Sequence, residues 1–245
     1  MKFENTQVFN FEGALRGMRN PMNSWEKSDS EFNVQTYWDN EKTLKAEFYP
    51  VVIGDNDLAL AQKLIRAGSE HRKFMRQIFV CVDITAPLYW WKEFDTYKVG
   101  TVANSTSTMH KLANTPITLG CFEIDDYLGS LKLSDQDLDA VVNYTDSIIG
   151  FCETLRLNYL KTKDKKYWKE LIRWLPESWL QMRTVTMNYE NLLAMCSKGQ
   201  RRFHKLNEWS GQDNPNVPNF ISWARTLPYA QELIFIDEAN NDKKN

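Results

Sequence analysis

Residues 78–91 read IFVCVDITAPLYWW and form a continuous apolar stretch. Its β-branched and aromatic residues extend over a length that suits a strand buried on both faces. Because Pro87 has no N–H to donate, we expect the hydrogen-bonding ladder to end there. The polar segment KEFDTYKVGTVANSTSTMH, residues 92–110, follows directly. The sequence therefore predicts a buried strand that leads into a polar segment.

The segment 92–110 is crowded with lysines, carboxylates, hydroxyls and amides. Such side chains can hydrogen-bond an anionic or heterocyclic ligand at many points, and polar segments held by a rigid scaffold often carry binding groups. An ordinary solvated loop has a similar composition. Composition alone therefore leaves both a binding segment and a loop open.

Strand and helix signals come before this region. The first fifty residues alternate short apolar and polar stretches, which is typical of one or two strands with turns. Residues 58–68, LALAQKLIRAG, have an apolar stripe at helical spacing, and Gly68 is the expected end of that helix. Asp55 or Asp57 can accept from the free amides at its start.

Long helices are predicted after the polar segment. Residues 133–162 have the clearest helical period in the chain, with Ser134 as the expected cap. A second helix is expected through YWKELIRWL, residues 167–175. Pro176 suits the first turn of a third helix, which we expect to cover residues 177–196.

These elements predict an α/β (α+β) fold in which a mixed sheet is packed with long helices. No linker or internal repeat is visible, so we expect a single domain over residues 1–245. Residues 207–219 are rich in Asn, Pro and Gly and predict an exposed loop. Residues 237–245 form a polar tail.

Composition limits the classes of function. A net charge of -2 argues against a general nucleic-acid coat and against a polybasic membrane anchor. The four cysteines are widely separated, there is no leader-like start, and no apolar run reaches about 18 residues. We therefore expect a reduced, cytoplasmic setting. The three histidines are not paired at ligand spacing, so no metal site is expected.

Five short pieces of sequence follow one another in the order and mostly at the intervals of a known family. They are His71 before Gln77, Ala86-Pro87 before Lys92-Glu93-Phe94, the segment from Asn104 to His110, Leu175-Pro176 before Asn188 and Leu192, and Arg225 before Ala230-Gln231. Together they resemble the motifs of the flavin-dependent thymidylate synthases. The resemblance spans roughly residues 55–236.

The chain departs from that family at several charged positions. Thr96-Tyr97-Lys98 stands where the family has Arg-His-Arg, so a single positive charge remains there. Glu190 and Ile172 each stand where the family has an arginine. An arginine grips phosphate oxygens bidentately, whereas a glutamate repels them. Other departures are Ser105 for Glu and Met109-His110 for Arg-Tyr.

Other cations remain that can replace these arginines. They are Lys92, Lys98, Arg173, Arg183, and the basic run 198–202 with Lys205. A basic run is also typical of solvated surface, so a surface position without a binding role remains the alternative for these residues.

The resemblance implies the family's fold and its chemistry. FAD, NADPH and a methylene folate serve there to methylate a pyrimidine nucleotide, dUMP, in a homotetramer. By position, the resemblance implies a catalytic Ser107. It implies that the nucleotide is bound by Lys92, Glu93, Lys98, Asn104, Ser105, Ser107 and Arg173, and the cofactor by His71, Tyr97, Asn188 and Gln231.

Two further functions are compatible with the same residues. The altered cations suit a protein that acts on another nucleotide, or one that binds a nucleotide without turnover. The high aromatic content also suits an interaction protein that uses its helices as a packing face. A turn hydroxyl that satisfies local backbone is the alternative role for Ser107.

Overall fold

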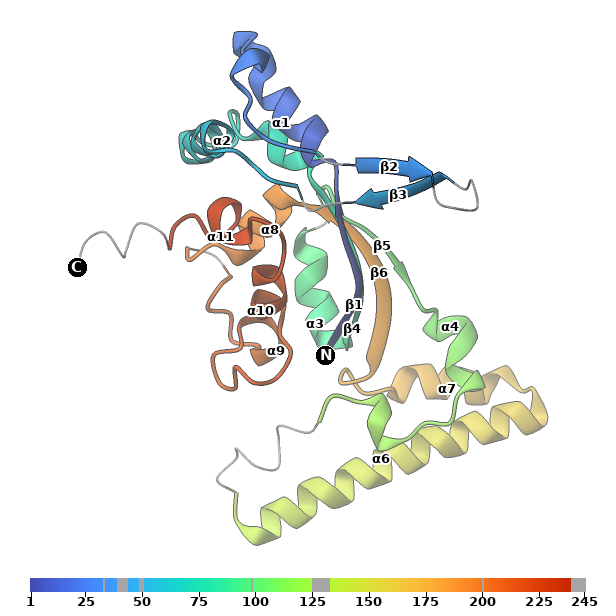
Figure 1. Cartoon of the computed structure of the whole chain (residues 1–245). Helices are drawn as coiled ribbons and strands as arrows, with labels where there is room; N and C mark the ends of the chain where they lie inside the picture. Colours follow the sequence, from blue (N-terminus) through green and yellow to red (C-terminus); the bar gives the residue numbers. More distant parts are fainter. Residues whose placement is uncertain are drawn as a thin grey trace. The chain divides into compact units, whose positions relative to one another are not determined.

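The structure is a computed structural model that describes residues 1–32, 34–38, 44–48, 51–97, 99–124, 133–199 and 201–238 (Figure 1). The chain forms two compact units. Unit 1 consists of Met1–Asn5, Val82–Lys98 and Ala103–Val185, and unit 2 of Thr6–Cys81, Val99–Val102 and Thr186–Asn245.

Two sheets are present in the described residues. A four-stranded sheet has the order β1-β4-β6-β5, formed by β1 (Lys2–Phe9), β4 (Phe79–Pro87), β6 (Leu180–Asn188) and β5 (Val102–Ser105). A two-stranded antiparallel sheet pairs β2 (Val34–Trp38) with β3 (Leu44–Phe48).

The helices account for much of the remaining chain. They are α1 (Phe11–Arg19), α2 (Asp55–Ala67), α3 (Leu88–Phe94), α4 (Thr108–Lys111), α6 (Asp135–Thr162), α7 (Lys165–Trp174), α8 (Tyr189–Cys196), α9 (Asn207–Ser210), α10 (Phe220–Arg225) and α11 (Ala230–Leu233). Short 3-10 turns include Lys73–Gln77, Asp95–Tyr97 and Leu112–Asn114. The predicted class, a mixed sheet packed with helices, is confirmed.

Strand β4 forms where the apolar stretch predicted it and ends at Pro87. Val80, Val82 and Ile84 are fully buried, whereas the residues between them are half-buried. The expectation that both faces are buried is therefore correct for one face only. The aromatic residues after Pro87 form α3, in which Trp90 and Trp91 are buried.

Helix α6 confirms the predicted helix with its cap, since the Ser134 hydroxyl accepts from the Asp137 N–H. Helix α2 ends at Gly68, also as predicted. Its predicted cap is wrong. The Asp29 carboxylate accepts from the Asp57 N–H at 3.0 Å, while the Asp57 side chain is buried against Arg19, with a distance of 2.5 Å between Nε and Oδ1.

The helix predicted over residues 177–196 is wrong, because its first part is strand β6. Gln181, Val185 and Met187 are buried at odd positions, which is a strand period rather than a helical one. The run Thr184–Thr186 is β-branched and favours an extended backbone. A helix, α8, begins only after Asn188.

In unit 1, α6 and α7 lie side by side (Figure 1). A buried cluster joins both helices to the segment before them: Leu112, Ile117, Phe122, Cys152, Leu155 and Leu171. Trp179, which immediately precedes β6, is partly buried and packs against this cluster. The cluster thus supports the residues from which the candidate site is built.

The predicted exposed loop 207–219 is exposed at residues 212–216, but it begins with α9, in which Trp209 is buried. Of the predicted polar tail, Asp237 and Glu238 are described, and both pair with Arg202. Residues 239–245 lie outside the described residues. Within the described ranges, no helix is both long and apolar enough to cross a membrane.

Candidate functional site

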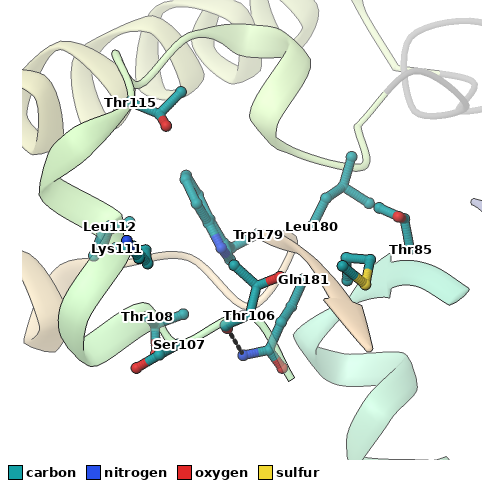
Figure 2. A pocket seen from close by; sticks show the side chains of 11 residues that line it. Thr85, Thr106, Ser107, Thr108, Lys111, Leu112, Thr115, Trp179, Leu180 and Gln181 are labelled. Carbon is teal, nitrogen blue, oxygen red and sulfur yellow. Dashed lines mark hydrogen bonds between the residues drawn. The ribbon is translucent and has the colours of Figure 1, made fainter. Parts of the chain in front are cut away.

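A cavity of about 210 Å³ lies in unit 1, beside the start of β6 (Figure 2). One side comes from β4, Trp179 and the start of β6, and the other from the chain between Thr106 and Thr115. The lining residues are Thr85, Thr106, Ser107, Thr108, Lys111, Leu112, Thr115, Trp179, Leu180, Gln181 and Met182. Hydroxyl groups therefore dominate the polar part of the wall.

Hydrogen bonds fix the wall segment 106–111 to β6. The Thr106 N–H donates to the Met182 carbonyl at 2.8 Å. The Gln181 amide donates to the Thr106 carbonyl at 3.1 Å, which is the dashed line in Figure 2. The Lys111 N–H in turn donates to the Ser107 carbonyl at 2.9 Å. The backbone is thus bonded to β6 at Thr106, directly before Ser107, and Ser107 is joined to Lys111 by a local helical bond.

Trp179 supplies a flat apolar surface in this hydroxyl-rich cavity. Figure 2 shows its indole among Thr106, Lys111 and Thr115. The ring packs edge-to-face on Phe122, with centroids 5.4 Å apart, and the Trp179 carbonyl accepts from the Leu88 N–H. A fixed aromatic ring beside several hydroxyls suits a planar polar heterocycle.

Among the predicted site residues, Ser107 lies in the cavity wall. Asn104 and Ser105 lie on β5 and are exposed, outside the lining set. Tyr97 is half-buried in a 3-10 turn, and Glu93 is half-buried on α3. Lys98 lies outside the described residues.

Three predicted cations of unit 1 that lie in the described residues are engaged with carboxylates. Lys92 contacts Glu177 at 2.7 Å, and Arg173 contacts Glu170 at 2.5 Å. Arg183, a candidate replacement for the missing arginines, contacts Asp95 at 3.0 Å and lies over the Trp91 ring. These three side chains do not line the cavity.

In unit 2, Asn188 is buried and caps α8. Its side chain accepts from the Asn191 N–H at 3.0 Å, and the Asn191 side chain accepts from the Asn188 N–H at 3.1 Å. The Asn191 amide also donates to the Val99 carbonyl at 2.7 Å. Gly100 has a φ of +81°, and a Cβ there would lie 3.1 Å from Asn188 Nδ2. The cap formed by Asn188 and Asn191 thus lies against Val99 and Gly100.

The other predicted cofactor-binding residues of unit 2 are exposed. His71 lies in a turn, and Gln231 lies on α11, where it hydrogen-bonds Glu238.

Glu190 shows what replaces the arginine expected at its position. Its carboxylate contacts Arg72 at 3.1 Å and forms a short contact with Arg76. Burial raises the pKa of Glu190, but hydrogen bonds from Arg76 and Arg72 and their charges outweigh it, so the pKa lies below its ordinary value. An acid on α8 therefore stands where the resemblance implied a base, and its partners are two arginines that follow His71 in the sequence.

Several lining residues were not predicted from the sequence, among them Lys111, Trp179 and Gln181. Trp179 and Gln181 lie in the stretch 177–196, which was predicted as a helix but contains strand β6. Lys111 follows the family-like motif by one residue, and nothing in that motif points to it.

The fold is similar to that of solved flavin-dependent thymidylate synthases. ThyX from Helicobacter pylori, complexed with FAD and dUMP, matches with a TM-score of 0.56 and 13% identity, over 97% of this chain and 99% of that chain. A second structure of ThyX from the same organism, with FAD and dUMP, gives a TM-score of 0.57 and 14% identity, over 97% and 98%. No family model and no curated protein matches the sequence. The predicted thymidylate synthase-like fold is confirmed, and at this identity the likeness shows the fold alone.

Proposed function

We propose that this chain binds a pyrimidine nucleotide such as dUMP and, with FAD, methylates it or modifies its base in a related way. The observation that carries the proposal is the cavity of unit 1, which combines the Trp179 indole with the hydroxyls around Ser107. The solved structures of similar fold, whose ligands are FAD and dUMP, support the same ligand class.

The cavity suits a pyrimidine ring better than a whole nucleotide. Its volume of about 210 Å³ is below the roughly 300–1,000 Å³ of pockets that enclose complete ligands. The indole offers a face for the ring, and hydroxyls both donate to its carbonyls and accept from its N–H. Ser107 is proposed to hydrogen-bond the base and stabilise charge that develops on it. The sugar and phosphate then extend out of the cavity.

The proposal extends to FAD binding by the residues that the resemblance implies, His71, Tyr97, Asn188 and Gln231, whose imidazole, phenol and carboxamide groups can hydrogen-bond a flavin. FAD supplies the redox chemistry when it is bound. The proposal extends to NADPH and a methylene folate as co-substrates, and to a cytoplasmic homotetramer. It also extends to the substrate contacts of Lys92, Glu93, Lys98, Asn104, Ser105 and Arg173.

A second candidate function is nucleotide binding without turnover. It is favoured by the ion pairs of Lys92 and Arg173, which bind carboxylates in the structure, and by the negative charge at Glu190. A protein of this kind keeps the cavity for the base and lacks the cations that hold the phosphate for catalysis.

Three measurements test the proposal and separate its two forms. The protein is first reconstituted with FAD, and its visible absorbance is recorded after gel filtration. Calorimetric titration with dUMP, UMP and dCMP follows, with and without FAD. We expect flavin absorbance and binding of at least one pyrimidine nucleotide. Methylated product with FAD, NADPH and methylene folate supports the enzyme, and binding without product supports the second candidate. Absence of any nucleotide binding at millimolar concentration would falsify both.

A further inference from the structure

Lys111 differs from the other basic residues around the cavity. Of the eleven lining residues it is the charged one, and in the described part of the chain its ammonium forms no salt bridge. Lys92, Arg173 and Arg183 are each within 3.0 Å of a carboxylate. The positive charge of Lys111 is therefore available to a ligand in a way that theirs is not.

The position of Lys111 suits a charged group at the cavity edge. It is the last residue of α4 and is exposed, while its N–H is fixed by the Ser107 carbonyl. A lysine carries a compact charge on a flexible stem with three donors, so it can follow a group that lies outside the cavity. A nucleotide with its base inside the cavity has such a group, its phosphate.

We propose that Lys111 contacts the phosphate of the bound nucleotide and makes the site prefer a nucleoside monophosphate to the corresponding nucleoside. This inference rests on the proposed function, because it needs the base to lie in the cavity. One mobile cation in place of arginine forks gives a contact that depends on charge and little on geometry. Lys111 is thus a specificity-determining residue, while Ser107 and Trp179 contact the base.

The test compares affinities for dUMP and deoxyuridine in the full-length protein. In the wild type we expect dUMP to bind more tightly. In Lys111→Gln the dUMP affinity should fall roughly five- to tenfold, as for a charge-assisted contact that is partly exposed. The deoxyuridine affinity should stay the same. Lys111→Arg should keep the preference, and Lys161→Gln, which changes an exposed lysine on α6 outside the cavity wall, should leave both affinities unchanged.

Salt provides an independent readout that needs no variant. Raising ionic strength should weaken dUMP binding to the wild type and leave deoxyuridine binding nearly unchanged, because the charged contact is screened. Equal wild-type affinity for dUMP and deoxyuridine, or an unaltered preference in Lys111→Gln, overturns the inference and leaves the proposed function standing. An equal fall for both ligands in Lys111→Gln also overturns it. Failure of both ligands to bind the wild type refutes the proposed function itself.

Discussion

Glu190→Gln removes the charge that Arg72 and Arg76 share, and we expect it to destabilise unit 2. The Glu190 side chain is 14% exposed, whereas Arg72 and Arg76 are 26% and 51% exposed. Breaking a buried pair costs about 3–5 kcal/mol, and an exposed pair contributes about 0.2–1 kcal/mol. Because the acid is half-buried and the bases are partly solvated, we expect a loss between these limits, about 1–3 kcal/mol.

The pH dependence of this loss follows from the depressed pKa of Glu190. A carboxyl whose pKa is lowered by folding stabilises the folded state above its unfolded pKa, near 4.5. That stabilisation disappears as the pH falls through the folded pKa. The wild type should therefore exceed Glu190→Gln in stability at pH 7, and the difference should shrink below about pH 4.5.

Urea denaturation at a series of pH values measures this difference. Glu177→Gln is the matched control, because Glu177 forms an exposed pair with Lys92 in which both side chains are more than half exposed. We expect the control to lose less than about 1 kcal/mol. Equal losses in the two variants would contradict this prediction. So would a stability difference between the wild type and Glu190→Gln that does not change between pH 7 and pH 3. Glu190→Arg should be worse than Glu190→Gln, because it places three cations together.

Three further predictions concern other parts of the molecule. Gly100→Ala should lower the free energy of unfolding, measured by urea denaturation, by about 1–2 kcal/mol, because a φ of +81° strains any side chain and the Cβ would lie 3.1 Å from the Asn188 amide nitrogen. Gly120→Ala is the control and should lower it much less, because a Cβ there would have nothing within 4 Å. Asp57→Asn breaks the buried ion pair with Arg19 and should lower the free energy of unfolding by about 3–5 kcal/mol in the same measurement. A loss below about 1 kcal/mol would contradict this prediction. Trp179→Ala should weaken dUMP binding at least about fivefold in calorimetry, since stacking on a base contributes about 1–3 kcal/mol, while Trp179→Phe should keep most of the affinity. Unchanged affinity in the alanine variant would mean that the indole does not contact the base.

Local signals predicted the elements that local residues determine. Pro87 ended β4 because its missing N–H is a property of that residue alone. Ser134 capped α6 because its hydroxyl reaches an N–H three residues ahead. The cap of α2 was predicted wrongly because its acceptor, Asp29, lies 28 residues before Asp57. No short-range pattern contains that partner.

The same distinction applies to the candidate site. Ser107 was selected from a motif that is contiguous in sequence, and it lies in the cavity wall. Trp179 and Gln181 were not predicted because they reach the cavity only through the pairing of β6. The hydrogen bond between Gln181 and Thr106 joins residues that are 75 positions apart in the sequence. A segment of nine residues with apolar side chains on one face fits a helix or a strand in isolation. The neighbouring strands decide between them.

The pairing of segment 106–111 with β6 also limits what a substitution at Ser107 can reveal. Two of the bonds that place this segment, from Thr106 to Met182 and from Gln181 to Thr106, involve the backbone of residue 106 rather than the Ser107 side chain. Ser107→Ala removes the hydroxyl and leaves both of these bonds in place. Gln181→Ala leaves the hydroxyl and removes one of the two bonds together with a lining amide. We therefore expect both variants to lower base affinity, and a larger loss in Gln181→Ala than in Ser107→Ala would mean that the β6 wall contributes more to base binding than the hydroxyl does.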